Sequence, residues 1–228
     1  MRPPETLPAS AHYRAFLFDC DGVLLNSNVV KTEAFYKAAL PWGERAATEL
    51  VEYHVSRGGV SRYEKFRYFL AEIVGQTKDE QAPLEQLLDD FARHVREGLM
   101  QCEEAPGLRE LLACLPAGCP RYVVSGGDQQ ELRRVFRERG LADGFDAIYG
   151  SPVDKRAHVK RLLEREAVQR PSVFFGDAWY DYEVASEAGL DFVFLHGWSE
   201  VSDWCERFSN EPVWVCRDLS EYRRLAAG

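Results

Sequence analysis

The sequence predicts an α/β protein built on a doubly wound parallel sheet, with an α-helical domain inserted after the first strand. Two observations lead to this prediction. From residue 106 onward, short apolar runs of strand type alternate with stretches of helical apolar spacing. Residues 28–102, in contrast, have helical spacing almost throughout and few strand signals. We therefore expect a core formed by residues 1–27 and 103–228, and a helical domain formed by residues 28–102.

Apolar spacing, together with the glycines and prolines that interrupt it, predicts each element in turn. The first strand is the apolar run at residues 13–18, which ends at an Asp and a Gly. The inserted helices are expected at residues 29–40, 46–55, 62–73 and 84–99. The remaining strands are expected at residues 121–125, 145–149, 172–176, 192–195 and 213–216. The other helices are expected at residues 108–115, 129–139, 155–166 and 181–188, and from residue 219. Parallel strands joined by helices form right-handed βαβ units, which predicts one doubly wound sheet.

Composition limits the classes of partner. The 228 residues, 46% of them hydrophobic, are enough for one core and a modest insertion. A net charge of −9 argues against nucleic acid and against an anionic membrane surface. No segment approaches the roughly 20 apolar residues of a membrane span. Residues 1–6 lack the apolar core of a signal peptide, so we expect a cytoplasmic protein. The sequence leaves the oligomeric state open.

Two aspartates stand at the carboxyl end of the first predicted strand. Asp19 and Asp21 lie two residues apart, and a glycine follows them. In a parallel α/β sheet, ligands bind at the carboxyl ends of the strands. Two crowded carboxylates repel each other unless a cation or a proton offsets their charge, and oxygen ligands of this kind favour Mg²⁺. The alternative is that the pair merely ends a strand at a turn, where Asp is common.

Three further strand-like runs are each followed by polar groups, namely Ser125 with Gly126, then Lys155, then Asp177 with Asp181. A hydroxyl and the free N–H groups of a glycine turn can hold a phosphoryl oxygen. An ordinary loop, a solvated lysine and a helix N-cap are the structural alternatives for these positions. The repetition at several strand ends favours one shared site.

The ordered set Asp-x-Asp, Ser, Lys and Gly-Asp-x-x-x-Asp resembles the haloacid dehalogenase-like hydrolase superfamily, over nearly the whole chain. The resemblance implies that Asp19 is the nucleophile, which forms an aspartyl-phosphate, and that Asp21 is the general acid and base. It implies that Ser125, Gly126 and Lys155 bind the phosphoryl group. It also implies a Mg²⁺ site formed by Asp19, Asp177, Asp181 and the backbone carbonyl of Asp21, where Asp181 ligates through water or orients the other ligands.

The resemblance also bears on two choices that the residues leave open. Lys155 fits the superfamily lysine better than Lys160, which falls deeper in the predicted helix, although Arg156 stands where many members have a proline. Asp21 favours a phosphate ester as the substrate, because the dehalogenase and phosphonate-cleaving branches lack an acid at that position.

Members of the superfamily often carry a helical cap domain after the first strand, which matches the helical segment expected here at residues 28–102. Within it, Arg57, Arg62 and Lys65 place positive charge around a Gly-Gly turn in an otherwise acidic protein. We expect this loop to close over the site and to contact the leaving group of the substrate. The alternative is a turn between two helices with solvated charges.

These observations together predict a Mg²⁺-dependent phosphatase that acts on a small phosphorylated metabolite, either a sugar phosphate or a phosphoglycolate-like acid. A phosphomutase of the β-phosphoglucomutase type shares the same motifs and is the nearest alternative. A non-catalytic binding protein on the same fold is a further alternative. The clustered carboxylates argue against it, because they destabilise a protein that has no use for them.

Overall fold

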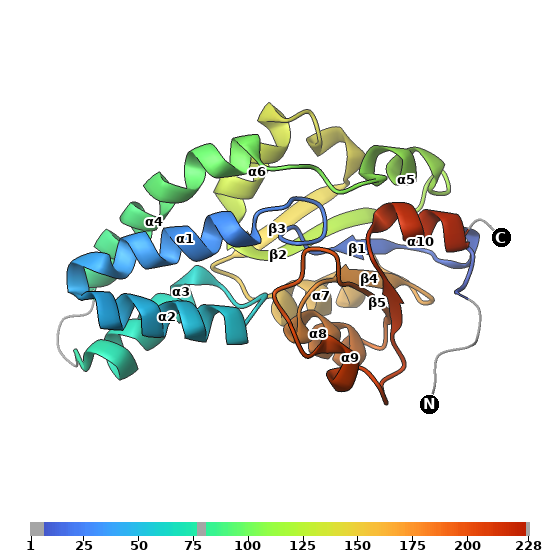
Figure 1. The fold of residues 1–228 in the computed structure, drawn as a ribbon. Helices are drawn as coiled ribbons and strands as arrows, with labels where there is room; N and C mark the ends of the chain where they lie inside the picture. The colour runs from blue at the N-terminus through green and yellow to red at the C-terminus, as the bar shows by residue number, and fades with distance from the viewer. Residues whose placement is uncertain (1–6, 77–80, 227–228) are drawn as a thin grey trace.

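The computed structural model describes residues 7–76 and 81–226, and it confirms the predicted α/β class (Figure 1). Six parallel strands form one sheet in the order β3-β2-β1-β4-β5-β6. The strands are β1 (Phe16–Phe18), β2 (Arg121–Asp128), β3 (Ala147–Ser151), β4 (Val173–Gly176), β5 (Asp191–Leu195) and β6 (Trp214–Cys216). Residues 1–6, on which the expected cellular location partly rests, lie outside the described residues.

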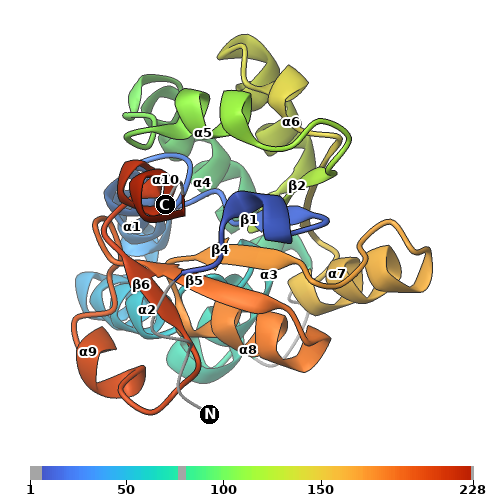
Figure 2. The ribbon, with the colours of Figure 1, turned by 90° about the vertical axis from the view of Figure 1, so that its right-hand side faces the viewer.

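Helices cover both faces of the sheet (Figure 2). Phe16 and Phe18 of β1 pack in one apolar cluster with α5 (Leu108–Cys114), α6 (Gln129–Glu138) and α10 (Leu219–Ala226). Leu17 of β1 points to the other face, where α7 (Lys155–Glu164) and α8 (Trp179–Ala188) pack. The short helix α9 (Trp204–Arg207) follows β5. Alternate residues of β1 thus enter the two halves of the core, as a strand buried on both faces requires.

The strand β1 lies in the middle of the sheet, where Phe18 pairs with Val123 of β2 and with Phe175 of β4. Its three residues are fully buried. This position brings the residues that follow β1 next to those that follow β2 and β4. The carboxyl ends of these three central strands are therefore where a site can form.

Four α-helices lie between β1 and α5, where the sequence predicted the inserted helices. They are α1 (Asn28–Ala39), α2 (Glu44–Ser56), α3 (Arg62–Tyr68) and α4 (Gln81–Gln101), and a π-helical segment (Phe69–Val74) continues α3. We call residues 28–101 the helical block. Phe35, Phe66 and Phe91 pack together at its centre. The block lies beside the carboxyl ends of the central strands (Figure 1). None of the helices within the described ranges has both the length and the apolar character of a membrane span.

Candidate active site

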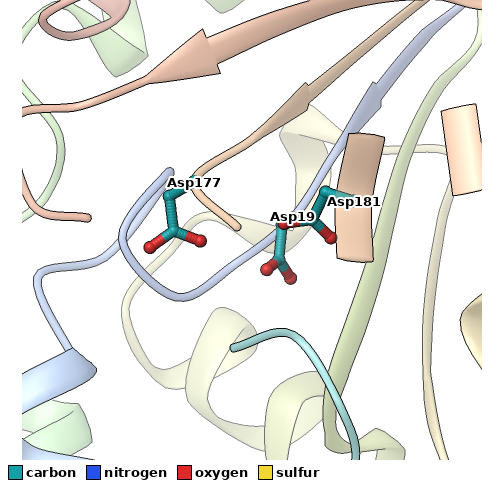
Figure 3. A group of neighbouring side chains, drawn as sticks. All are labelled: Asp19, Asp177 and Asp181. Atoms are coloured by element: carbon teal, nitrogen blue, oxygen red, sulfur yellow. The ribbon is translucent and has the colours of Figure 1, made fainter. Parts of the chain in front are cut away.

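Three buried aspartates meet at the carboxyl edge of the sheet. Asp19 follows β1, Asp177 follows β4, and Asp181 lies in the first turn of α8 (Figure 3). One carboxylate oxygen from each residue lies within 4.8 Å of the others. The site thus brings together three of the four residues that the sequence predicted as metal ligands.

Lys155 supplies the positive charge next to this group. Its Nζ lies 2.9 Å from Asp19 Oδ2 and 2.5 Å from Asp181 Oδ1, and its side chain is almost fully buried. The helix α7 begins at Lys155 because Asp154 caps it by accepting a hydrogen bond from the backbone N–H of Arg156. Lys160, the other candidate lysine, is exposed and faces Glu164 on the same helix. The structure therefore places Lys155 in the site, as expected.

The single ammonium of Lys155 does not balance three carboxylates. Burial raises the pKa of Asp19 to about 7; Lys155 opposes this shift, whereas Asp181 and Asp21 add to it. Burial also raises the pKa of Asp177 well above its usual value, with further contributions from Asp19 and Asp181. The pKa of Lys155 is itself raised, because the attraction of Asp181 and Asp19 outweighs the effect of burial.

This donor set fits Mg²⁺. The ligand atoms are all hard carboxylate oxygens, and the group has an excess of negative charge that a divalent cation would offset. Asn28 donates a hydrogen bond of 2.8 Å to Asp177 Oδ2, which orients that carboxylate. Both oxygens of Asp181 are engaged, one by Lys155 and the other by the backbone N–H of Ala178. Both oxygens of Asp19 are engaged too, by Lys155 and by the backbone N–H of Cys20. Asp19 and Asp177 line the adjacent cavity, whereas Asp181 does not, so these two are the better placed direct ligands.

The carboxylate of Asp21 lies apart from this triad and faces α1. It accepts a hydrogen bond of 2.5 Å from Ser27 Oγ and forms an ion pair with Lys31. Burial alone would raise the pKa of Asp21, but Lys31 and the hydrogen bonds from Lys31 and Ser27 outweigh burial and lower it. Asp21 is thus held as a carboxylate, and Lys31 links it to the helical block.

The end of β2 and a loop of the helical block approach each other over the site. Ser125 is buried, and its Oγ accepts a hydrogen bond of 3.0 Å from Gly127 N. A Cβ atom on Gly126 would lie 2.4 Å from the backbone oxygen of Gly59, so only glycine allows this approach. Gly59 has a positive φ of 81° and lies against the side chains of Lys155 and Asp181. The loop therefore covers the phosphoryl-binding residues predicted from the sequence.

The three cationic residues predicted in this loop have different surroundings. Arg57 is exposed and lines an outer groove between α2 and α8. Arg62 is buried and donates hydrogen bonds of 2.5 and 3.3 Å to Glu131 of α6. Lys65 is buried, with its Nζ 2.6 Å from His54 Nδ1. The alternative of solvated charges therefore holds only for Arg57.

A small cavity lies between the helical block and the core. Its volume is ≈ 50 Å³, and Asp19, Asp21, Asp177 and the Gly126–Gly127 turn form the wall on the core side. The wall on the side of the helical block includes Lys31, Phe35, His54, the Gly58–Val60 loop, Arg62, Lys65 and Phe91. Ser125, Lys155 and Asp181 lie behind the first layer of this wall. The cavity therefore joins the acidic triad to a cationic surface.

Residues 13–189 match the family model of the haloacid dehalogenase-like hydrolases. The match covers most of the chain and includes every residue of the acidic triad and Lys155. The chain belongs to the haloacid dehalogenase-like hydrolase family. This membership confirms the resemblance that the spacing of the motifs indicated.

Solved structures support the fold of this haloacid dehalogenase-like hydrolase. A predicted phosphatase from Clostridium acetobutylicum superposes with a TM-score of 0.73 at 19% identity, over 93% of this chain and 97% of the other. A predicted phosphoglycolate phosphatase from Haemophilus somnus gives 0.72 at 18% identity, with the same coverage. CbbY from Rhodobacter sphaeroides, solved in complex with phosphate, gives 0.67 at 20% identity, over 92% and 96%. A comparison with curated proteins finds no match.

Several residues of the site were missed by reasoning from the sequence. Asn28 and Lys31 could have been found, because they lie three residues apart on one face of α1, directly after the first motif. His54 and Glu200 carry no local signal, and they reach the cavity only through the packing of α2 and of the loop after β5. For this hydrolase, the motifs thus locate the core side of the site and not the wall formed by the helical block.

Proposed function

We propose that this hydrolase is a Mg²⁺-dependent phosphatase that acts on a small phosphorylated metabolite, a sugar phosphate or a phosphoglycolate-like acid. The observation that supports this best is the position of Asp19. Its carboxylate lines the cavity, lies 2.9 Å from Lys155 Nζ and belongs to the same buried group as Asp177. The names of two structural neighbours, both predicted phosphatases, point to the same class of reaction.

In the first half-reaction, Asp19 attacks the phosphorus atom, the ester P–O bond breaks, and an aspartyl-phosphate forms. Lys155 holds Asp19 in place and offsets charge that is shared with the phosphoryl group. Ser125 and the backbone N–H groups around Gly126 bind phosphoryl oxygens. Asp19, Asp177 and the backbone carbonyl of Asp21 would hold the Mg²⁺, and Asp181 would orient the site. The bound Mg²⁺ supplies charge stabilisation to the transferring phosphoryl group.

In the second half-reaction, water attacks the phosphorus atom, and Asp21 accepts a proton from that water. The lowered pKa of Asp21 keeps its carboxylate ionised and free to accept this proton, and it also makes Asp21 a weaker base. As a general acid in the first half-reaction, Asp21 must carry a proton for the leaving group, which the ammonium of Lys31 opposes. We infer that Lys31 leaves Asp21 when the substrate enters.

We also propose that the helical block, within residues 28–102, acts as a cap domain over this site. The contact between Gly59 and the end of β2 supports this role, because it places a loop of the helical block against the site. A site covered by a cap favours small substrates over proteins. In this proposal, Lys65 and Arg62 lie on the side of the leaving group, and Arg57 lies outside.

The experiment that tests this proposal measures phosphate release from a panel of small phosphate esters, with Mg²⁺ and with a chelator. We expect Mg²⁺-dependent release from a few esters and loss of release in Asp19→Asn. The matched control is Asp143→Asn, an exposed aspartate before β3, at the other edge of the sheet. Release that persists in Asp19→Asn would exclude the aspartyl-phosphate mechanism. Isomerised sugar phosphate without net release would instead indicate the phosphomutase.

A further inference from the structure

Among the residues that the structure describes, Lys65 is a buried lysine without a carboxylate partner. Its side chain is 2% exposed, and its Nζ lies 2.6 Å from Nδ1 and 3.3 Å from the backbone oxygen of His54, and 5.5 Å from the centroid of the Phe35 ring. Within residues 7–76 and 81–226, the other buried lysine and arginine side chains, those of Lys31, Arg62 and Lys155, all form ion pairs. An uncompensated buried charge is costly, so this wall of the cavity attracts a negative group.

His54 adds a second unsatisfied group to the same wall. Its Nε2 is buried and has no hydrogen-bond partner within residues 7–76 and 81–226, and a carboxylate oxygen of Glu200 lies 4.0 Å from it. Burial, Lys65 and Lys31 together lower the pKa of His54 well below its usual value, so the ring is neutral. A neutral ring can donate one N–H to a ligand. A buried donor that lacks a partner in the free protein gains one when such a ligand binds.

Both residues face the same cavity as the nucleophile. Lys65 and His54 line the cavity that Asp19 and Asp177 also line, and they do not line the larger outer groove. Asp19 belongs to the wall on the core side, and Lys65 belongs to the wall on the side of the helical block. A substrate whose phosphoryl group lies at Asp19 would therefore present its leaving group to Lys65.

We propose that Lys65 and His54 form a subsite for a carboxylate on the leaving group, so that the substrate is a small phosphorylated carboxylic acid. This inference rests on the proposed phosphatase function. A carboxylate can accept hydrogen bonds from both groups and neutralise Lys65, whereas the hydroxyl groups of a sugar bring no charge.

The first test compares 2-phosphoglycolate with its uncharged amide, which has nearly the same shape. We expect kcat/KM to be about tenfold to a hundredfold higher for the acid, as charge-assisted hydrogen bonds imply. In Lys65→Met this preference should fall to about one, because methionine keeps the length and loses the charge. Lys37→Met, on the exposed face of α1, is the control and should keep the full preference. Equal preference in Lys65→Met and the wild type would overturn the subsite.

A second test measures binding without turnover. Burial and Lys31 lower the pKa of Lys65 to about 7, so most of the amine is neutral at about pH 8. The charged groups that also act on it are Glu200, Asp21 and Lys155. Calorimetry of 2-phosphoglycolate with Asp19→Asn at saturating Mg²⁺, in two buffers of different ionisation enthalpy, should show uptake of about one proton. The uptake should disappear with the amide and in Asp19→Asn combined with Lys65→Met.

The outcomes separate this inference from the proposed function. Hydrolysis of phosphate esters without preference for the acid would leave the phosphatase standing and overturn the subsite. Binding of 2-phosphoglycolate with proton uptake, but without hydrolysis by the wild type, would overturn the phosphatase and leave the anion subsite standing. Binding without proton uptake at about pH 8 would contradict the role of Lys65.

Discussion

The charge at Asp19 links metal binding to pH. In the folded, metal-free protein the pKa of Asp19 is raised to about 7, mainly by burial, whereas its usual value is 3.8. Asp177 shifts in the same direction. At a pH between these two pKa values, the folded protein keeps protons on these carboxylates that the unfolded chain has lost. These residues therefore lower the free energy of unfolding as the pH rises from about 4 to about 7.

Mg²⁺ should remove this penalty, because it stabilises the ionised carboxylates. We expect the increase in melting temperature caused by Mg²⁺ to be larger at about pH 8 than at about pH 6. In Asp177→Asn the difference between the two pH values should shrink. Thermal unfolding with Mg²⁺ and with a chelator, at both pH values, measures this increase in melting temperature. An increase that does not depend on pH would contradict the raised pKa values.

Lys155 carries a structural role besides its role in the proposed chemistry. Lys155→Met leaves Asp19 and Asp181 buried without their cation. We expect the metal-free free energy of unfolding to fall by about 3 kcal/mol, and Mg²⁺ to recover part of this loss. Urea denaturation with and without Mg²⁺ provides the measurement. Lys160→Met removes a lysine from an exposed ion pair on the same helix, and it should change the free energy of unfolding by less than about 0.5 kcal/mol.

Individual site residues could be predicted from the sequence where they lie next to the end of a strand. Asp19, Asp177 and Lys155 could be predicted because the carboxyl ends of parallel strands, and the residues next to them, meet at one edge of the sheet. The ion pair of Arg62 with Glu131 joins residues far apart in the chain, and no local pattern shows it. The burial of Lys65 against His54 depends in the same way on how two helices pack.

The contact between α3 and α6 holds the helical block on the core. Arg62 pairs with Glu131, and the hydroxyl of Tyr63 donates a hydrogen bond of 2.9 Å to Asp128, which also caps α6. Both contacts come from the first turn of α3 and reach the first turn of α6. The two helices are therefore coupled at the mouth of the site.

Glu131→Gln should weaken this coupling, because it leaves the guanidinium of Arg62 buried without a charged partner. We expect the free energy of unfolding to fall by about 3 kcal/mol, and KM to rise more than kcat falls. Denaturation and steady-state kinetics on the same preparation test both effects. Glu138→Gln, at an exposed position of the same helix, is the control. An unchanged KM would show that this contact does not hold the block in its binding position.

The observed ends of the helices and strands differ from the predicted ends at several places. The helix expected at residues 62–73 forms, but it widens to a π-helix after Tyr68 and ends at Gly75, which has a positive φ of 74°. The strand expected at residues 145–149 instead spans Ala147–Ser151, because Phe145 is buried against Phe18 without pairing in the sheet. Apolar spacing reports burial, and strand pairing is a separate property. The short helix α9 has too few residues for a periodic signal.

For the whole molecule, ligand binding should tighten the contact between the helical block and the core. We expect Mg²⁺ with inorganic phosphate to slow amide hydrogen exchange at residues 58–61 and 126–128, where the loop meets the end of β2. Residues 142–144, at the other edge of the sheet, serve as the internal reference. Phosphate binding with unchanged exchange in the loop would contradict a capping role.

The insertion of the helical block between β1 and β2 has a consequence for how this protein can diverge. Asp19, Ser125 and Asp177 lie in or directly after β1, β2 and β4, inside the sheet, where a substitution disturbs packing on both faces. Lys65 and His54 belong to helices outside the sheet. If these two residues bind the leaving group as proposed, mutations there would change the preferred leaving group while the reactive centre stays intact. Substrate preference could then change during evolution through substitutions in the helical block alone, with the protein active at every step.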